Sequence, residues 1–194
     1  MSDKEKIVLD TIFTRRSIRQ FIEGKVIEDK KIKKLLEAAM AAPSACNLQP
    51  WEFIVVTKKE SLDNVNSAMM NRTFNAPLAV IVCANTKNIP WEGNGWMIDC
   101  AASVMNMMTA AVAMDLGSVW IGSHQEDKIR KLFEIPDNIK VMSIVYFGYP
   151  DETAPAGTRY AEDAVFNEIY DPSRVRNMRT MEMLPDRSVK TPEI

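Results

Sequence analysis

The sequence predicts an α+β protein in which a β-sheet is covered by helices. The chain opens with two helical patterns before any strand pattern. The few strand patterns that follow are interleaved with further helices, without the regular alternation of a doubly wound fold. Its 194 residues suit one hydrophobic core, since single cores usually serve roughly 100–200 residues. We therefore expect one domain over residues 1–160 and a C-terminal arm over residues 161–194.

The helical patterns consist of apolar residues spaced three and four apart. A short amphipathic helix contains Leu9, Ile12 and Phe13, and a second should end before Pro43. The apolar positions of the second helix and of two later ones are Ile32, Leu35, Leu36, Ala39 and Met40, then Leu62, Val65 and Met69, then Ile129, Leu132 and Phe133. The uncharged stretch Cys100–Met114 is apolar on every face, which predicts a central helix surrounded by protein.

Three short apolar runs, rich in β-branched and aromatic residues, predict buried strands. They are Trp51–Val56, Leu78–Cys83 and Ile139–Phe147. From Arg174 onward, charges and methionines alternate without a clean period. Such an arm is either disordered or laid on a partner subunit, and its apolar side chains favour the partner.

Composition excludes several classes of protein. Lys and Arg number 24 against 26 Asp and Glu, and the net charge of −2 leads us to expect neither nucleic-acid nor membrane binding. A single histidine, His124, excludes metal sites that need two, and three cysteines without a CxxC pair predict no disulfide framework and no metal. The charged start Met1–Lys6 leads into no signal-peptide core, so we expect a cytoplasmic protein.

The first candidate binding segment is Thr14–Phe21, where three arginines and a serine follow the first helix. Guanidinium groups hold anions through forked, charge-assisted hydrogen bonds, and phosphate is the natural candidate. The alternative is a basic surface turn paired with nearby carboxylates.

The second candidate segment is Ala42–Trp51, which joins a helix to the first strand. Two prolines fix its backbone, while Ser44, Asn47 and Gln49 carry hydroxyl and amide groups suited to the edge of a polar heterocycle. The alternative is a plain helix stop followed by a strand start.

The third candidate segment is Leu116–His124. Gly117 is expected to end the central helix, and Gly122 with Ser123 to let a ligand approach the backbone closely. The chain has neither a GxxxxGK[ST] loop nor a GxGxxG turn, which argues against nucleoside triphosphate chemistry. A serine hydrolase would have to use His124 without a GxSxG elbow, so we set it aside.

Taken in this order, the three segments resemble the nitroreductase family of flavin enzymes, over roughly Ile12–Arg159. Arg15–Phe21 is similar to the family's RRSxRxF, and Pro43–Trp51 to its PSxxNxQPW. The run Asn75-Ala76-Pro77 before a strand, and Gly117–Gly122, are also similar to the family. The departures are Met105, Ala45 and Gly157, where glutamine, serine and a basic residue are common.

The resemblance implies a central mixed β-sheet covered by helices and a homodimer whose subunits embrace through the C-terminal arms. It implies FMN at the subunit interface, reduced by NAD(P)H and reoxidised by nitroaromatics, quinones or similar small acceptors in a ping-pong mechanism. A flavin needs positioning and tuning rather than a protein base or nucleophile, so no catalytic side chain is expected. The same fold leaves open a specialised flavin reaction, such as reductive dehalogenation, dehydrogenation or flavin fragmentation, or a noncatalytic flavin-binding sensor.

The resemblance also implies which residues bind the cofactor. The residues expected toward the phosphate, ribityl chain and pyrimidine are Arg15, Arg16, Ser17 and Arg19, with Arg19 stabilising the N1 and C2 carbonyl region. The residues expected from the other subunit are Pro43, Ser44, Asn47 and Gln49, and those expected along the ring are Ile121, Gly122 and Ser123. Arg159 is expected to be a late phosphate-binding arginine. Either Asn71 or Asn75 could meet the pyrimidine, and Trp91, Trp96 and His124 are either pocket walls or ordinary packing and surface residues.

Overall fold

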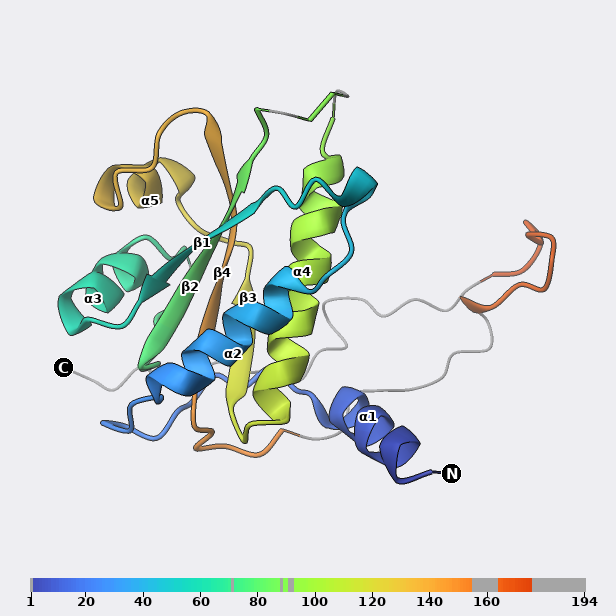
Figure 1. The fold of residues 1–194 in the computed structure, drawn as a ribbon, viewed down its shortest axis with the longest axis horizontal. Helices are drawn as coiled ribbons and strands as arrows, with labels where there is room; N and C mark the ends of the chain where they lie inside the picture. The colour runs from blue at the N-terminus through green and yellow to red at the C-terminus, as the bar shows by residue number, and fades with distance from the viewer. Residues whose placement is uncertain (1, 71, 88, 91–92, 155–163, 176–194) are drawn as a thin grey trace. The chain divides into compact units, whose positions relative to one another are not determined.

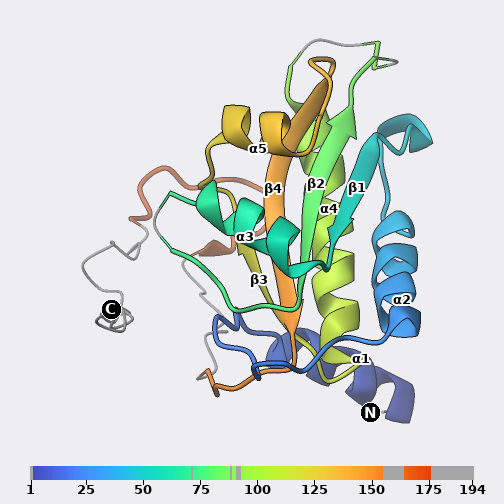
Figure 2. The ribbon, with the colours of Figure 1, turned by 90° about the vertical axis from the view of Figure 1, so that its left-hand side faces the viewer.

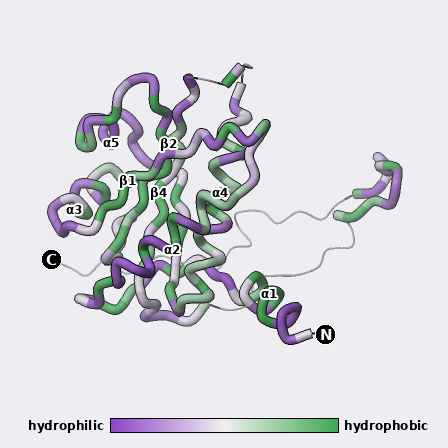
Figure 3. Tube along the Cα trace, viewed as in Figure 1, coloured by the Kyte–Doolittle hydropathy of each residue, from purple (hydrophilic) through white to green (hydrophobic). Residues whose placement is uncertain are grey.

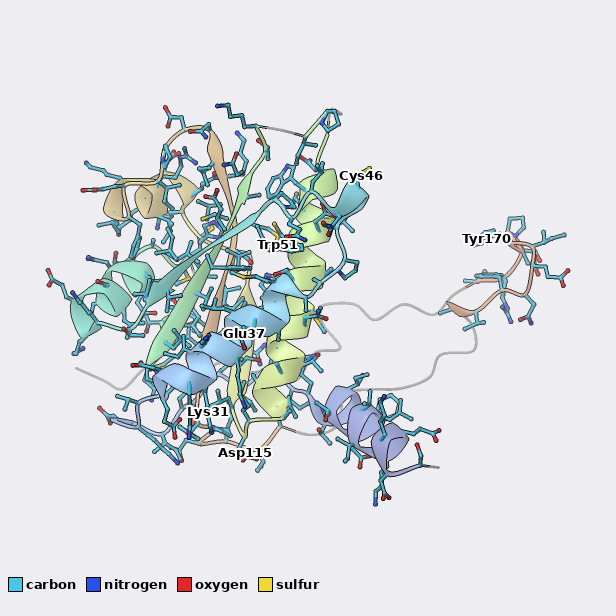
Figure 4. All side chains as sticks on the ribbon, in the orientation of Figure 1. Lys31, Glu37, Cys46, Trp51, Asp115 and Tyr170 are labelled. Carbon is cyan, nitrogen blue, oxygen red and sulfur yellow. The ribbon has the colours of Figure 1, made fainter. Side chains whose placement is uncertain are left out.

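The structure, a computed structural model, describes residues 2–70, 72–87, 89–90, 93–154 and 164–175. The chain forms two compact units, Met1–Gly157 and Thr158–Ile194. The expected boundary at residue 160 falls outside the described residues, as does Arg159, so the division into domain and arm stays a prediction. In the second unit, the described residues form a small turn in which the rings of Phe166 and Tyr170 lie 4.4 Å apart (Figure 4).

The first unit contains all the helices and strands of the described residues (Figure 1). The helices are α1 (Asp3–Thr14), α2 (Asp29–Met40), the short 3-10 helix η1 (Ala45–Asn47), α3 (Lys59–Ser67), α4 (Gly95–Val112) and α5 (Glu126–Leu132). The strands are β1 (Trp51–Val56), β2 (Leu78–Asn85), β3 (Gly117–Ile121) and β4 (Ile139–Gly148).

The four strands form one sheet in the order β1-β2-β4-β3, with every neighbouring pair antiparallel. Helices α3 and α5 lie on one face of the sheet and α2 and α4 on the other (Figure 2). Each face has its own core, with Val65 and Ile129 in the first and Leu35 and Met107 in the second. The α+β class is confirmed, and the expected mixture of strand directions is limited to an isolated parallel bridge between Ser17 and Ser118.

Strand β3 occupies part of Leu116–His124, the third candidate segment, for which no strand was expected. The expectation that Gly117 ends the central helix is wrong, because α4 ends at Val112 and Asp115 takes the left-handed conformation there, with φ of 61°. Gly117 instead begins β3 and pairs directly with Gly148 of β4. Two neighbouring positions at this end of the sheet are therefore glycines, which have no side chain.

These two glycines make room for the segment that follows α1. A Cβ on Gly117 would lie 2.8 Å from the Ile18 side chain, and one on Gly148 would lie 2.6 Å from the Phe21 ring. Both neighbours are buried, so neither can move aside without disturbing the core. The glycine pair is thus a seat for Ile18 and Phe21.

Two helices expose apolar side chains. None of the residues of α1 is buried, although the helix carries Ile7, Val8, Ile12 and Phe13, and Figure 3 shows hydrophobic and hydrophilic residues intermixed along it. Helix α4 is not surrounded on all sides by its own chain, since Ile98 is 74% exposed. No helix in the described ranges has the length and hydropathy needed to span a bilayer.

The glycine seat predicts a specific loss of stability. Gly148→Ala should lower the free energy of unfolding by about 1–3 kcal/mol, because the added methyl group overpacks the Phe21 site. Gly122→Ala is the control, since nothing lies within 4 Å of its Cβ position, and it should change stability by less than about 0.5 kcal/mol. Urea denaturation measures both, and equal stability of the two variants would contradict the packing argument.

Candidate functional site

The Arg15–Phe21 segment is fastened to the ends of β3 and β4 by backbone hydrogen bonds. The N–H of Ile18 donates to the carbonyl of Ser118 at 2.9 Å, and the N–H of Ile22 donates to the carbonyl of Tyr149 at 2.9 Å. The segment is therefore held at the edge of the sheet, with Ile18 and Phe21 buried beneath it.

Two side chains from distant parts of the chain also clamp this segment. Asn75 donates from Nδ2 to the carbonyl of Phe21 at 2.8 Å and accepts the Phe21 N–H on Oδ1 at 3.3 Å. Glu152 accepts the backbone N–H groups of Arg19 and Gln20. Of the two asparagines left open by the sequence, Asn75 has its amide engaged with Phe21, and Asn71 lies outside the described residues.

The arginines of the segment are partly buried, and two of them contact nearby carbonyls. Arg16 donates from Nη1 to the carbonyls of Phe13 at 2.7 Å and Arg15 at 2.5 Å, which covers the C-terminal end of α1. Arg19 donates from Nη1 to the carbonyl of Ser17 at 3.2 Å. These contacts orient the guanidinium groups along the segment.

The Pro43–Gln49 loop lies between α2 and β1 and is held by its own polar groups. Ser44 accepts the Gln49 N–H on Oγ at 3.0 Å, and Gln49 donates from Nε2 to Oδ1 of Asn47 at 2.8 Å. Cys46, Asn47 and Gln49 all have positive φ, at 50°, 55° and 48°. This backbone conformation costs about 1–2 kcal/mol for each residue other than glycine. Contacts from outside the loop are therefore expected to hold it in addition to its own hydrogen bonds.

One of those contacts comes from α4. The backbone N–H of Ala45 donates to Oδ1 of Asp99 at 3.0 Å, and Asp99 is only 7% exposed. The sequence gives no signal for this role of Asp99, because its position beside an apolar stretch is equally typical of an exposed residue near a helix start.

The third group, Ile121–Ser123, lies at the opposite end of β3 from Ser118. Beside it is an open apolar hollow of about 500 Å³. Its lining residues are Met97, Ile98 and Ala101 of α4, Trp120 and Gly122 on and just after β3, and Met142 of β4. Gly122 has open space where a side chain would be, so its backbone is accessible to a flat ligand.

Within one chain, the arginine segment and the Pro43–Gln49 loop lie toward opposite ends of α4. Ser118 of β3 and Gly122, just after the strand, are four residues or about 13 Å apart, so the arginine segment and the Gly122 hollow lie along the same strand. The contact between Asp99 and Ala45 lies near the start of α4, where Met97, Ile98 and Ala101 also line the hollow, and a helical rise of 1.5 Å per residue puts Asp99 about 20 Å from Val112 at the other end. Figure 4 shows Cys46 of the loop and Asp115, just before β3, at opposite ends of the unit.

The remaining candidate residues are less accessible or lie elsewhere. Burial lowers the pKa of His124 below its usual 6.5, against an opposing effect of Glu126, and its Nδ1 is buried without a partner in the described chain.

Burial raises the thiol pKa of Cys83 and Cys100 to about 12, whereas Cys46 is exposed. Trp96 packs partly buried against the α4 core, and Trp91 lies outside the described residues. No cluster of potential metal ligands occurs among the residues described.

Comparison with known proteins decides the family. The family model for the nitroreductase family matches residues 12–79 and 70–149. The chain belongs to the nitroreductase family. This makes it an oxidoreductase enzyme, as the three sequence motifs imply.

Relatives of this nitroreductase-family chain cover most of its length. A protein of Archaeoglobus fulgidus is 40% identical over 82% of this chain and 97% of its own, and it carries the provisional name NADH dehydrogenase/NAD(P)H nitroreductase. A crystal structure from Bacteroides thetaiotaomicron with the same provisional name has a TM-score of 0.78 at 32% identity, covering 84% of this chain and 98% of that one. An FMN-dependent nitroreductase from Clostridium difficile has a TM-score of 0.70 at 28% identity, with the same coverage.

The environment of His124 predicts its titration. Burial lowers the pKa of His124 in the folded state. As the pH falls below 6.5, the unfolded chain therefore binds a proton at His124 that the folded chain does not bind. Stability should therefore fall between about pH 7.5 and about pH 5.5 more steeply in the wild type than in His124→Gln. As the only histidine, His124 gives one set of ring signals by NMR in tag-free protein, and a midpoint at or above 6.5 would contradict the burial argument.

Proposed function

We propose that this protein is an FMN-dependent oxidoreductase that takes hydride from NAD(P)H and reduces nitroaromatics, quinones or another small conjugated acceptor. The observation that carries the proposal is the arrangement along β3, with a basic segment at one end and an apolar hollow beside an open glycine at the other. The relatives named as NAD(P)H nitroreductases and the FMN-dependent structural neighbour support the same cofactors.

The residues present fit an FMN molecule. Arg15, Ser17 and Arg19 supply cationic and hydroxyl donors for a phosphate and a polyol chain. Ile121, Gly122 and Ser123 supply accessible backbone beside an apolar surface suited to a flat ring. Arg159 is proposed as a second phosphate ligand from the sequence alone.

A homodimer would complete the site. The Pro43–Gln49 loop is held at Asp99, about 20 Å along α4 from Val112, after which the chain continues to the strand that holds the arginine segment. We therefore propose that the loop serves the site of the partner subunit. The unburied apolar residues of α1 and the exposed Ile98 of α4 support this, since such side chains are usually covered in a stable assembly. Pro43, Ser44, Asn47 and Gln49 would then approach the cofactor from across the interface.

The chemistry that bound FMN would supply is hydride transfer from NAD(P)H to the acceptor. The chain's own residues bind and tune the FMN. The Arg19 guanidinium would hold a positive charge beside the N1 and C2 carbonyl region of a bound flavin, and so would favour its reduction. The apolar side chains of Met97, Trp120 and Met142 would shield one side of the ring from water. We further propose ping-pong kinetics, with donor and acceptor using the same space in turn.

The visible spectrum of the purified protein tests the proposal. Flavin bands should be present and should bleach on anaerobic addition of NADH or NADPH, then return with a nitroaromatic or quinone. Bands that resist both donors would favour the sensor or the specialised reaction. A colourless protein that cannot be reconstituted with FMN would contradict the proposal.

The role of Arg19 predicts a graded loss of FMN affinity. Arg19→Ala should raise the FMN Kd about tenfold or more, because it removes charge-assisted hydrogen bonds. The Kd of Arg19→Lys should lie between those of the wild type and Arg19→Ala. Lys33→Ala, on the exposed side of α2, removes the same charge away from the site and is the matched control. Quenching of flavin fluorescence gives the Kd, and equal values for Arg19→Ala and Lys33→Ala would rule out the assigned role.

A further inference from the structure

Asp99 is the only charged residue among those that the structure describes as buried. It lies near the start of α4, and its hydrogen-bond partner in the described chain is the backbone N–H of Ala45, which is 54 residues away in sequence. A carboxylate removed from water is costly unless it is hydrogen-bonded. The position of this carboxylate therefore depends on the loop, and the loop depends on it.

The contact acts at the point where the loop turns. Ser44 is extended, with φ of −142° and ψ of 156°, and Ala45 begins η1. The Asn47 N–H then donates to the Ser44 carbonyl at 3.0 Å, and the three left-handed residues follow within the same turn. No residue of η1 is buried, so apolar packing of η1 does not fix this conformation.

We propose that Asp99 is a positioning residue, which holds the strained Ser44–Gln49 turn in the conformation that presents Ser44 and Asn47 to the cofactor in the partner's site. The proposal rests on the proposed function for the identity of that cofactor. The positioning itself does not, because the hydrogen bond to Ala45 exists in the chain without a ligand.

Amide hydrogen exchange at Ala45 tests the positioning directly in the full-length protein without FMN. Asp99→Ala should speed exchange of the Ala45 N–H about tenfold, because it removes a charged acceptor. Asp99→Asn keeps a side-chain oxygen that can accept the same N–H, so it should stay closer to wild type. Val104→Ala, a core truncation five residues further along α4, is the control for general destabilisation and should leave the Ala45 amide protected.

FMN affinity tests the consequence. The Kd should rise about tenfold in Asp99→Ala, much less in Asp99→Asn, and not at all in Val104→Ala. Should Asp99→Ala fail to fold, Ala45→Pro removes the donor instead. Proline suits the first position of a helical turn after an extended residue, and this variant should weaken FMN binding in the same way.

Unchanged Ala45 exchange in Asp99→Ala would overturn the proposal, and so would equal acceleration in Val104→Ala. Faster exchange with an unchanged Kd would overturn the link to the cofactor. A wild-type protein that does not bind FMN would instead overturn the proposed function, while the exchange result for Asp99 would stand.

Discussion

Helix α4 sets the distance between the two halves of the candidate site. Its first turns hold the Pro43–Gln49 loop through Asp99 and line the Gly122 hollow, and the chain that leaves its last turn becomes β3, whose first residues hold the arginine segment. Because the helix packs along the sheet, it cannot bend to bring its two ends together, and about 20 Å remains between them. One chain therefore offers two half-sites. A two-chain site is the arrangement that would use both, and the unburied apolar residues of α1 and α4 provide a surface for it.

The arginine segment has no regular secondary structure, yet it is held by many contacts. Ile18 and Phe21 fill the space left by Gly117 and Gly148, and the backbone between them is bonded to β3, to the end of β4, to Asn75 and to Glu152. Fixing the backbone in advance reduces the entropy lost when an anion binds to the side chains. The packing of Ile18 and Phe21 against the two glycines thus holds in place the arginines that we propose bind the phosphate.

The sequence predicted the periodic elements well, because helical spacing and apolar runs report burial directly. The patterns over α2, α3, α4, α5 and the strands β1, β2 and β4 correspond to elements of the structure. Strand β3 was missed because a five-residue strand that starts with glycine reads as a turn. The roles of Asp99, Asn75 and Glu152 were not predictable, since each bonds to a backbone group far away in the chain, and backbone groups leave no pattern in sequence. The motif residues were found only through their combined order and spacing.

A mixed dimer tests the two-chain site most directly. One chain would carry Arg19→Ala, the other Ser44→Ala and Asn47→Ala, and the heterodimer would be isolated with two different tags. If each site combines the arginine segment of one chain with the loop of the other, the heterodimer has one site with all the changes and one intact site. It should then bind one FMN with wild-type affinity, while both variant homodimers bind weakly. A heterodimer that binds as weakly as both parents would contradict the account, because it would place each site within a single chain.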